Sequence, residues 1–537
     1  MDFNRASFTK SQAWLHSWVG LLIGWLLFVI FFAGTATVFR GQADYWLQPE
    51  LHHPSNRNDL ELLRLAEKAL HEKSPRDAEK WAINFPTGRD ERFSITWRLP
   101  ASSGLSWYTR DQKRYLNSDN GDLLPEPRKT RAMTMLYVLH YSLYQARVGI
   151  WIVGGLSVAM LVLLLGGVII HKKIFKDFFT FRPNKSPGRS WLDFHNFSSV
   201  MVLPFTLMIT YTGLIIWWYI WMPFGITAAN ESQSKYESLG KPEFVEIVPP
   251  ASGLAITDSL IDMVGRAREL QPQADRLQSI VIQNPWQENS TVYIYQEESG
   301  RYWGALYGYE FDGITGEPRR KIRMGQDDSS ALVAFQIISR IIHEISFATP
   351  LLRWLYFLMS ALSCAMIATG LILWSVKRRA KFIKEKSSGK AIMLGTLWWL
   401  SVEAINLGVI MGIIISTATM FWANRLIPSN YSGRDTLEID VFFCTWLICA
   451  LFSAWRVFRV KLSSKAKWDM RKIWGEQVCI AAFLYLLLPV LNMISTPNSS
   501  LWVTLNTGQW VVAAFDMTMF ILGGMLFWGA RFLAKGR

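Results

Sequence analysis

The chain has 537 residues, of which 50% are hydrophobic and 14% aromatic, and its formal net charge is +14 at pH 7. Together with a positive mean hydropathy of +0.15, this composition excludes an ordinary soluble enzyme and indicates a polytopic membrane protein. The 4 cysteines all lie in apolar runs, so the sequence offers neither a disulfide framework nor a CxxC motif.

Several apolar runs are long enough to cross the hydrocarbon, which takes about 20 helical residues. They lie at residues 17–39, 149–170, 197–222, 352–376, 394–422, 438–458, 476–495 and 510–532. We therefore predict a membrane all-α helical bundle with about eight transmembrane helices. The first run is longer than a signal peptide and lacks a small-residue cleavage site, so it is expected to remain as a helix.

Basic residues gather in alternate loops, at 172–189, 377–390, 456–472 and 531–537. The positive-inside rule places these loops in the cytoplasm together with both chain termini. The net charge then reflects membrane topology, and nothing favours nucleic-acid binding. The two long polar segments, 40–135 and 223–335, are expected on the other side, in the periplasm of a cell with two membranes.

Five of the eight histidines lie close to the ends of apolar runs, at His16, His140, His171, His195 and His343. Ionisable residues are costly in a membrane, and imidazoles on neighbouring helices supply the axial ligands that haem iron needs. Haem is favoured over zinc because no cysteine or carboxylate accompanies the histidines. On one continuous helix, His140 and His171 would lie about 46 Å apart, which predicts that His140 lies outside the hydrocarbon.

An internal duplication relates two parts of the chain. Each part repeats spacings of 18 and 27 positions from a histidine to a later glycine: His16–Gly34 and His195–Gly213, then His140–Gly167 and His343–Gly370. Both polar segments also carry a helical stretch, alternating strand-like runs and a hairpin signal, which predicts a small α+β module used twice.

The predicted domains follow in chain order. They are transmembrane helix 1 at 1–39, the first module at 40–135, helix 2 at 136–176, a cytoplasmic loop at 177–196, helix 3 at 197–222, the second module at 223–335, helix 4 at 336–380 and a C-terminal four-helix membrane extension at 391–537.

Several local sequences point to a family. They are His171–Pro183, Leu192–Asn196, Leu203–Phe205, Ile209–Leu214 and the hairpin Asp312–Glu317. Over roughly residues 10–380 the chain resembles the PepSY-associated transmembrane family. The resemblance implies periplasmic PepSY-like modules and kinship with dihaem ferric-siderophore reductases of the bacterial inner membrane, which carry haem b. The last 150 or so residues depart from the short members of the family.

The duplication makes His16 equivalent to His195, and His140 equivalent to His343. We therefore predict an inner haem held by the first pair and an outer haem held by the second. His171 has no equivalent in the second part of the chain, and it is an alternative inner ligand or the ligand of a separate haem.

Two arginines follow the outer histidines, and two carboxylates lie in the C-terminal apolar runs. Arg147 and Arg353 are candidates to pair with haem propionates, with lipid headgroups as the alternative. Glu403 and Asp516 would each serve as a proton or quinone group or else find an ordinary polar partner.

The chain contains no glycine loop for a nucleotide and no nucleophile elbow. Electrons are therefore expected from membrane quinol or a cytoplasmic reductase, and the resemblance implies a periplasmic ferric siderophore as their acceptor. Hard oxygen ligands hold Fe(III) better than Fe(II), so reduction would release the iron. The alternatives are a siderophore or metal permease and a non-redox PepSY binding or regulatory membrane protein.

Overall fold

The protein is described from a computed structural model, which covers residues 5–53, 57–106, 109–170, 187–221, 259–274, 276–297, 306–323, 331–387, 393–460 and 466–535. The chain divides into two compact units. The first unit is Met1–Leu47, Lys129–Leu214 and Trp354–Arg537, and the second is Gln48–Arg128 and Ile215–Arg353.

Among the described helices, 8 are long and apolar enough to cross a membrane, which confirms the predicted number and the class of a multi-pass membrane protein. Four of them form the histidine-bearing part: α1 (Arg5–Thr37), α5 (Ala146–Ile170), α7 (Pro187–Ile216) and α13 (Pro350–Ser387). The other four form the C-terminal extension: α14 (Met393–Leu426), α15 (Arg434–Phe458), α16 (Ala466–Ser495) and α18 (Trp510–Lys535).

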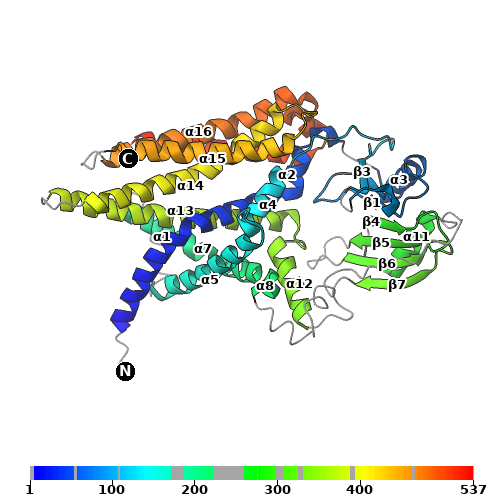
Figure 1. Cartoon of the computed structure of the whole chain (residues 1–537), viewed down its shortest axis with the longest axis horizontal. Coiled ribbons are helices and arrows are strands. Elements are labelled where there is room, and N and C mark those ends of the chain that lie inside the picture. Colours follow the sequence, from blue (N-terminus) through cyan, green and yellow to red (C-terminus); the bar gives the residue numbers. More distant parts are fainter. Residues whose placement is uncertain are drawn as a thin grey trace. The chain divides into compact units, whose positions relative to one another are not determined.

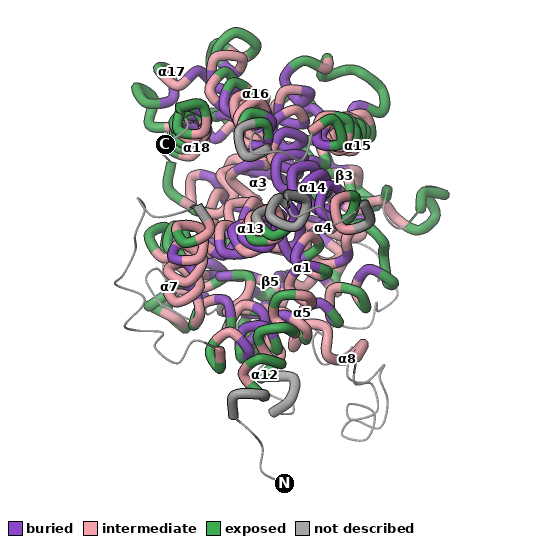
Figure 2. Tube along the Cα trace, turned by 90° about the vertical axis from the view of Figure 1, so that its left-hand side faces the viewer, coloured by how far each residue is buried: buried purple, intermediate pink, exposed green. Residues whose placement is uncertain are grey.

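Shorter helices complete the first unit. They are α2 (Arg40–Trp46), α4 (Ala132–Ser142), α17 (Leu501–Asn506) and the 3₁₀ turn Pro497–Ser499. Helix α14 is the most enclosed span, with 78% of its apolar window buried, and Figure 2 shows it as a largely purple helix among its neighbours. It packs against α15 and α16 and also against α1, so it joins the extension to the histidine-bearing helices.

The chain breaks its helix directly after His140. Leu143 and Tyr144 have φ angles of 48° and 58°, so α4 ends there and α5 starts afresh. A Cβ on Gly149 would lie 1.6 Å from the carbonyl oxygen of Ser142, so only glycine lets α5 start this close to α4. The continuous helix assumed for the separation of about 46 Å is therefore wrong. A similar break follows His343, where Ile345 has a φ of 58°.

The second unit contains a seven-stranded antiparallel sheet in the order β3-β2-β1-β4-β5-β6-β7. The first module supplies β1 (Lys80–Asn84), β2 (Ser94–Arg98) and β3 (Asp111–Tyr115). The second supplies β4 (Arg276–Gln283), β5 (Thr291–Glu297), β6 (Leu306–Asp312) and β7 (Pro318–Arg323). The first strands of the two modules pair with each other, from Lys80 opposite Gln283 to Asn84 opposite Ser279. The repeated modules thus form one continuous sheet.

Two helices, one from each module, cover the same face of this sheet: α3 (Asp59–Lys73) and α11 (Leu260–Leu270) (Figure 1). Trp81 and Ile83 of β1 and Ile280 and Ile282 of β4 are each 1% exposed or less, and they belong to one shared core. The short helices α8 (Trp218–Trp221) and α12 (Ala331–Glu344) and the 3₁₀ turns Pro49–Leu51 and Ala101–Ser103 also belong to this unit.

Candidate functional site

His16 lies on α1 and reaches the neighbouring helix α5. Its Nδ1 lies 3.1 Å from the carbonyl oxygen of Leu163. Gly167 is one helical turn beyond Leu163, and a Cβ on that glycine would lie 3.5 Å from Cε1 of His16. The imidazole therefore rests against a glycine and hydrogen-bonds to the carbonyl four residues before it.

His195 repeats this geometry between α7 and α13. Its Nδ1 lies 2.9 Å from the carbonyl oxygen of Met366. Gly370, again four residues later, would bring a Cβ to 3.1 Å from Cε1 of the imidazole. The hydroxyl of Thr369 lies 3.4 Å from the same Nδ1. The two histidines that the duplication makes equivalent therefore have equivalent surroundings.

His140 shows the same geometry between α4 and α1. Its Nδ1 lies 2.8 Å from the carbonyl oxygen of Ile30, and a Cβ on Gly34 would lie only 2.7 Å from Cε1 of the ring. Burial lowers the pKa of His140 below its usual value, and the bond to Ile30 offsets part of this effect.

The spacing of four residues has a simple cause. In a helix, the N–H of residue i+4 bonds to the carbonyl of residue i, and that carbonyl keeps a second lone pair. A side chain at i+4 would cover this lone pair, whereas glycine leaves room for an imidazole. Because a carbonyl oxygen only accepts, Nδ1 carries the proton and Nε2 carries the lone pair, as in metal-ligating histidines.

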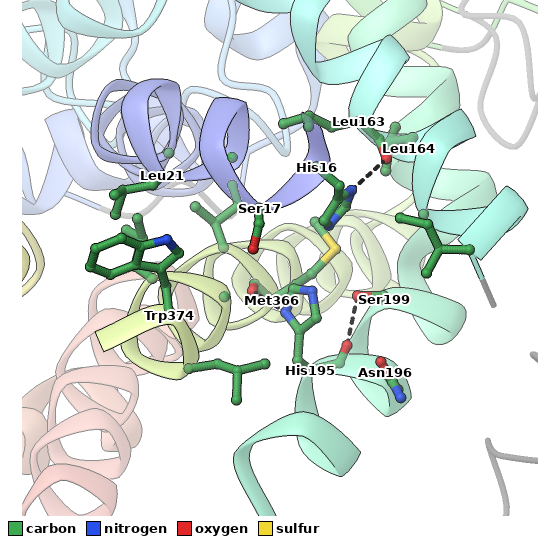
Figure 3. Close-up of a pocket in the computed structure, with 18 of the residues that line it drawn as sticks. His16, Ser17, Leu21, Leu163, Leu164, His195, Asn196, Ser199, Met366 and Trp374 are labelled. Atoms are coloured by element: carbon green, nitrogen blue, oxygen red, sulfur yellow. Dashed lines mark hydrogen bonds between the residues drawn. The ribbon is translucent and has the colours of Figure 1, made fainter. Parts of the chain in front are cut away.

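His16 and His195 line the same cavity of about 340 Å³ between α1, α5, α7 and α13. Figure 3 shows both imidazoles at this cavity, with the thioether of Met366 between them in that view. Leucine, isoleucine, valine and glycine make up most of the wall, and none of its lining residues is acidic or a cysteine. Lys377 is the one cation among those lining residues.

These residues fit a b-type haem. Imidazoles from two helices can offer their Nε2 atoms to iron, apolar walls suit a macrocycle, and a lysine can pair with a propionate. The site lies wholly within the first unit, so both histidines are placed in one compact body. The predicted inner pair is thus brought to one cavity, while haem binding itself stays a prediction.

The remaining predicted ligands are placed less completely. His171 lies outside the described residues, although the preceding Ile170 lines the cavity. His343 is half-buried in the last turn of α12 in the second unit, whereas His140 belongs to the first unit. The outer pair therefore stays a prediction.

The two predicted propionate partners differ in exposure. Arg147 is exposed in the first turn of α5, and Arg353 is only 5% exposed in the first turn of α13. Arg89, in the loop between β1 and β2, donates a hydrogen bond to the carbonyl of Ile345 and lies within electrostatic reach of Arg353. Local sequence patterns carry no signal for this role of Arg89, because its contact with Ile345 spans more than 250 residues of chain.

The two carboxylates of the C-terminal apolar runs both have polar partners. Asp516 accepts hydrogen bonds from Trp46 Nε1 at 2.9 Å and from Asn492 Nδ2 at 3.0 Å. The side chain of Glu403 hydrogen-bonds to Ser375 and Trp474. Both carboxylates therefore have the ordinary polar partners that were the alternative to a role as a proton or quinone group.

A model of a known protein family matches a large part of the chain. The model of the PepSY-associated TM region matches residues 13–377, which is 365 of the 537 residues and agrees with the resemblance seen over residues 10–380. No curated protein matches the chain significantly. Because the match covers well over half of the sequence, the chain belongs to the PepSY-associated transmembrane family.

Proposed function

We propose that this protein is a haem b-dependent oxidoreductase of the bacterial inner membrane, with both termini in the cytoplasm. In this proposal it carries electrons across the membrane to a ferric siderophore in the periplasm and releases the iron as Fe(II). The observation that carries the proposal is the imidazole held by a carbonyl and a glycine of a neighbouring helix, found at His16, His195 and His140.

At the inner site the chain would fix the cofactor without needing any proton transfer. Haem b would supply one-electron redox chemistry when bound. His16 and His195 would hold the iron through Nε2, since their Nδ1 atoms bond to carbonyls. Lys377 would pair with a propionate, and the apolar wall would exclude water.

At the outer site the duplication assigns the corresponding roles to His140 and His343. Arg147 and Arg353 would be propionate partners there. An acceptor too polar to enter the membrane requires a site of this kind near the outer surface.

The substrate assignment rests on the family resemblance and on coordination chemistry. One electron converts siderophore-bound Fe(III) to Fe(II), which hard oxygen donors bind much less tightly. Nothing in this step requires a nucleophile or an acid–base residue from the protein. The electron donor would be membrane quinol or a cytoplasmic reductase, because the sequence has no recognisable nucleotide-binding loop.

The deciding experiment is a reduced-minus-oxidised visible spectrum of the detergent-purified protein, with haem measured per chain. The proposal predicts low-spin b-type haem at two equivalents per chain. Protein expressed with ample haem yet containing none would overturn it, and would favour the permease or the regulatory protein.

A second experiment tests the direction of electron transfer. His343→Ala should leave the inner haem reducible and abolish reduction of an external ferric siderophore, followed with an Fe(II)-selective chelator. The variant His71→Ala is the matched control, because His71 packs its ring against Trp81 and Trp286 in the sheet unit. Unchanged Fe(III) reduction in the His343 variant would contradict the outer-site assignment.

A further inference from the structure

The C-terminal extension contains a cluster of two buried arginines and two buried carboxylates. Arg425, Arg434, Glu438 and Asp516 are each 6% exposed or less. Formal charges of two cations and two anions balance within the cluster. An unpaired charge is very costly in such surroundings, so each charged group needs several hydrogen-bond partners. These partners identify the chain segments that the cluster binds.

One half of the cluster binds the chain directly before α4. Arg434 Nη1 lies 2.9 Å from Glu438 Oε1 and donates to the carbonyl of Lys129 at 3.0 Å. The hydroxyl of Thr130 donates to Glu438 Oε2 at 2.6 Å. Helix α4 begins at Ala132, so two consecutive residues are held just before its first turn.

The other half binds the end of α2. Trp46 Nε1 donates to Asp516 Oδ1 at 2.9 Å, and its carbonyl accepts from Arg425 Nη2 at 2.6 Å. The guanidinium of Arg425 also lies 3.8 Å from the centre of the Trp46 indole ring. Asn424 joins the two halves, because it donates to Glu438 at 2.9 Å and accepts from Arg425 at 2.6 Å.

These two attachment points have a special place in the chain. Trp46 directly precedes Leu47, the last residue of the first unit before the chain enters the second unit. Lys129 is the first residue after the chain returns to the first unit. The cluster therefore fixes both covalent ends of the first external module within the first unit. Helix α4, which starts from one of these ends, carries His140.

His140 has little tolerance for movement of α4. Its Nδ1 bond to Ile30 on α1 is 2.8 Å long, and the space above Gly34 is too small for even a Cβ. A small displacement of α4 would therefore break the bond or drive the ring into α1. The extension itself supplies no histidine ligand, since the sequence has no histidine after His343.

We propose that the extension is a positioning element for the outer haem site, in which Arg434 and Glu438 set the start of α4 and thereby the imidazole of His140. This inference rests on the proposed function for its haem readout. Arg434, Glu438 and Thr130 are positioning residues, because none of them touches the site where a ligand would bind.

The first variant is Thr130→Val, which removes the hydroxyl that donates to Glu438 and also accepts from the Ala132 N–H at 3.4 Å, and leaves the buried ion pair in place. The Ala132 contact is kept in Glu438→Gln, so an effect shared by both variants comes from the bond to Glu438. Glu438→Gln is the stronger variant. Glu476→Gln is the matched control, because Glu476 pairs with Arg456 at 2.6 Å in the same extension and both side chains are about a quarter or more exposed. Each full-length variant is examined by electron paramagnetic resonance, by redox titration and by amide hydrogen exchange.

We expect Thr130→Val and Glu438→Gln to change the spectrum and midpoint potential of one haem, or to lose that haem, while the other stays as in the wild type. Amide exchange at residues 131–137 should become roughly tenfold faster, the factor for losing one hydrogen bond to a charged group. The retained haem shows that the variant is folded, and the control should match the wild type.

Two haems with unchanged potentials and unchanged exchange in both variants would overturn the inference. So would an equal effect on both haems in Thr130→Val. A wild-type protein without haem would instead refute the proposed function. In that case the exchange rates would still show whether Glu438 and Thr130 hold the start of α4.

Discussion

The histidine-bearing helices and the C-terminal extension both bury polar groups, but they do so in opposite ways. In the first region His16, His195 and His140 each bond to a backbone carbonyl of a neighbouring helix, and two of these rings also line a cavity of about 340 Å³. In the extension, carboxylates and guanidiniums bond to one another and to side chains until several partners surround each. A buried polar group beside a cavity indicates ligand binding, whereas a buried group inside a closed network indicates positioning or stability.

The largest expected effect comes from removing an inner imidazole. His195→Ala and His16→Ala should each halve the haem content per chain, because one axial ligand is lost from the inner site. Pyridine haemochrome analysis of purified protein measures this directly. His171→Ala decides between the alternatives. If that variant loses haem while His16→Ala keeps it, His171 is the true partner of His195.

The next effect belongs to the extension and should leave the inner haem bound. Asp516→Asn removes a buried carboxylate that accepts from Trp46 and Asn492, and Asn492 in turn accepts from Arg425. The buried charge of Arg425 then has less compensation, and an uncompensated buried charge costs about 3 kcal/mol or more. We expect a clear fall in the thermal unfolding midpoint in detergent, with the inner haem still bound at the wild-type ratio. Asp440→Asn, an exposed carboxylate of α15, is the control. Selective loss of the inner haem would contradict the assignment of ligand binding to the histidine-bearing helices and of positioning and stability to the extension.

A graded series of glycine variants sharpens the description of the histidine-bearing region. A Cβ added to each glycine would lie at a different distance from Cε1 of the neighbouring imidazole. The distance is 2.7 Å from His140 at Gly34, 3.1 Å from His195 at Gly370 and 3.5 Å from His16 at Gly167. Alanine at Gly34 should cost about 1–3 kcal/mol by overpacking and displace the imidazole, with less effect at Gly370 and least at Gly167.

Haem spectra and thermal midpoints of the three alanine variants measure this order. Gly20→Ala is the control, because nothing lies within 4 Å of a Cβ built there although Gly20 lines the cavity. Equal effects at all three glycines would show that the rings do not rest on them as described.

Much of this architecture could be predicted from local patterns. Apolar runs of spanning length gave the helix number, since the hydrocarbon thickness sets that length. The repeated spacings of 18 and 27 positions singled out Gly34, Gly167 and Gly370, and the structure supplies their physical role beside three of the histidines. The spacing alone could not reveal which glycine serves which ring, because the partners lie on different helices.

Other features depend on contacts that leave no local signal. The pairing of β1 with β4 joins segments about 200 residues apart, so the sequence showed two modules and not one sheet. The break between α4 and α5 uses positive φ angles at Leu143 and Tyr144, which are not the residues that usually mark such a turn. Lys377 looked like an ordinary basic residue of a cytoplasmic loop, yet it lines the cavity.

The smallest expected effect comes from an ion pair outside the spans. Arg98 and Asp111 pair at 2.6 Å on neighbouring strands, but the two side chains are 20% and 38% exposed. Water and salt compete with such a pair, so Asp111→Asn should cost less than about 1 kcal/mol at pH 7. The buried pair of Arg434 and Glu438 has the same chemistry without that competition.

The stabilisation that this ion pair contributes depends on pH. The hydrogen bond from Arg98 lowers the pKa of Asp111 below its usual value, although burial and weaker charge effects also act on it. A lowered carboxyl pKa means that the stabilisation is present at neutral pH and is lost as the pH falls through the folded-state pKa. Amide exchange across β2 and β3 should therefore distinguish Asp111→Asn from the wild type at pH 7 but not at strongly acidic pH. A difference in exchange that persisted in acid would show that the substitution acts through packing and not through the ion pair. The comparison between this exposed ion pair and the buried pair in the extension would then fail.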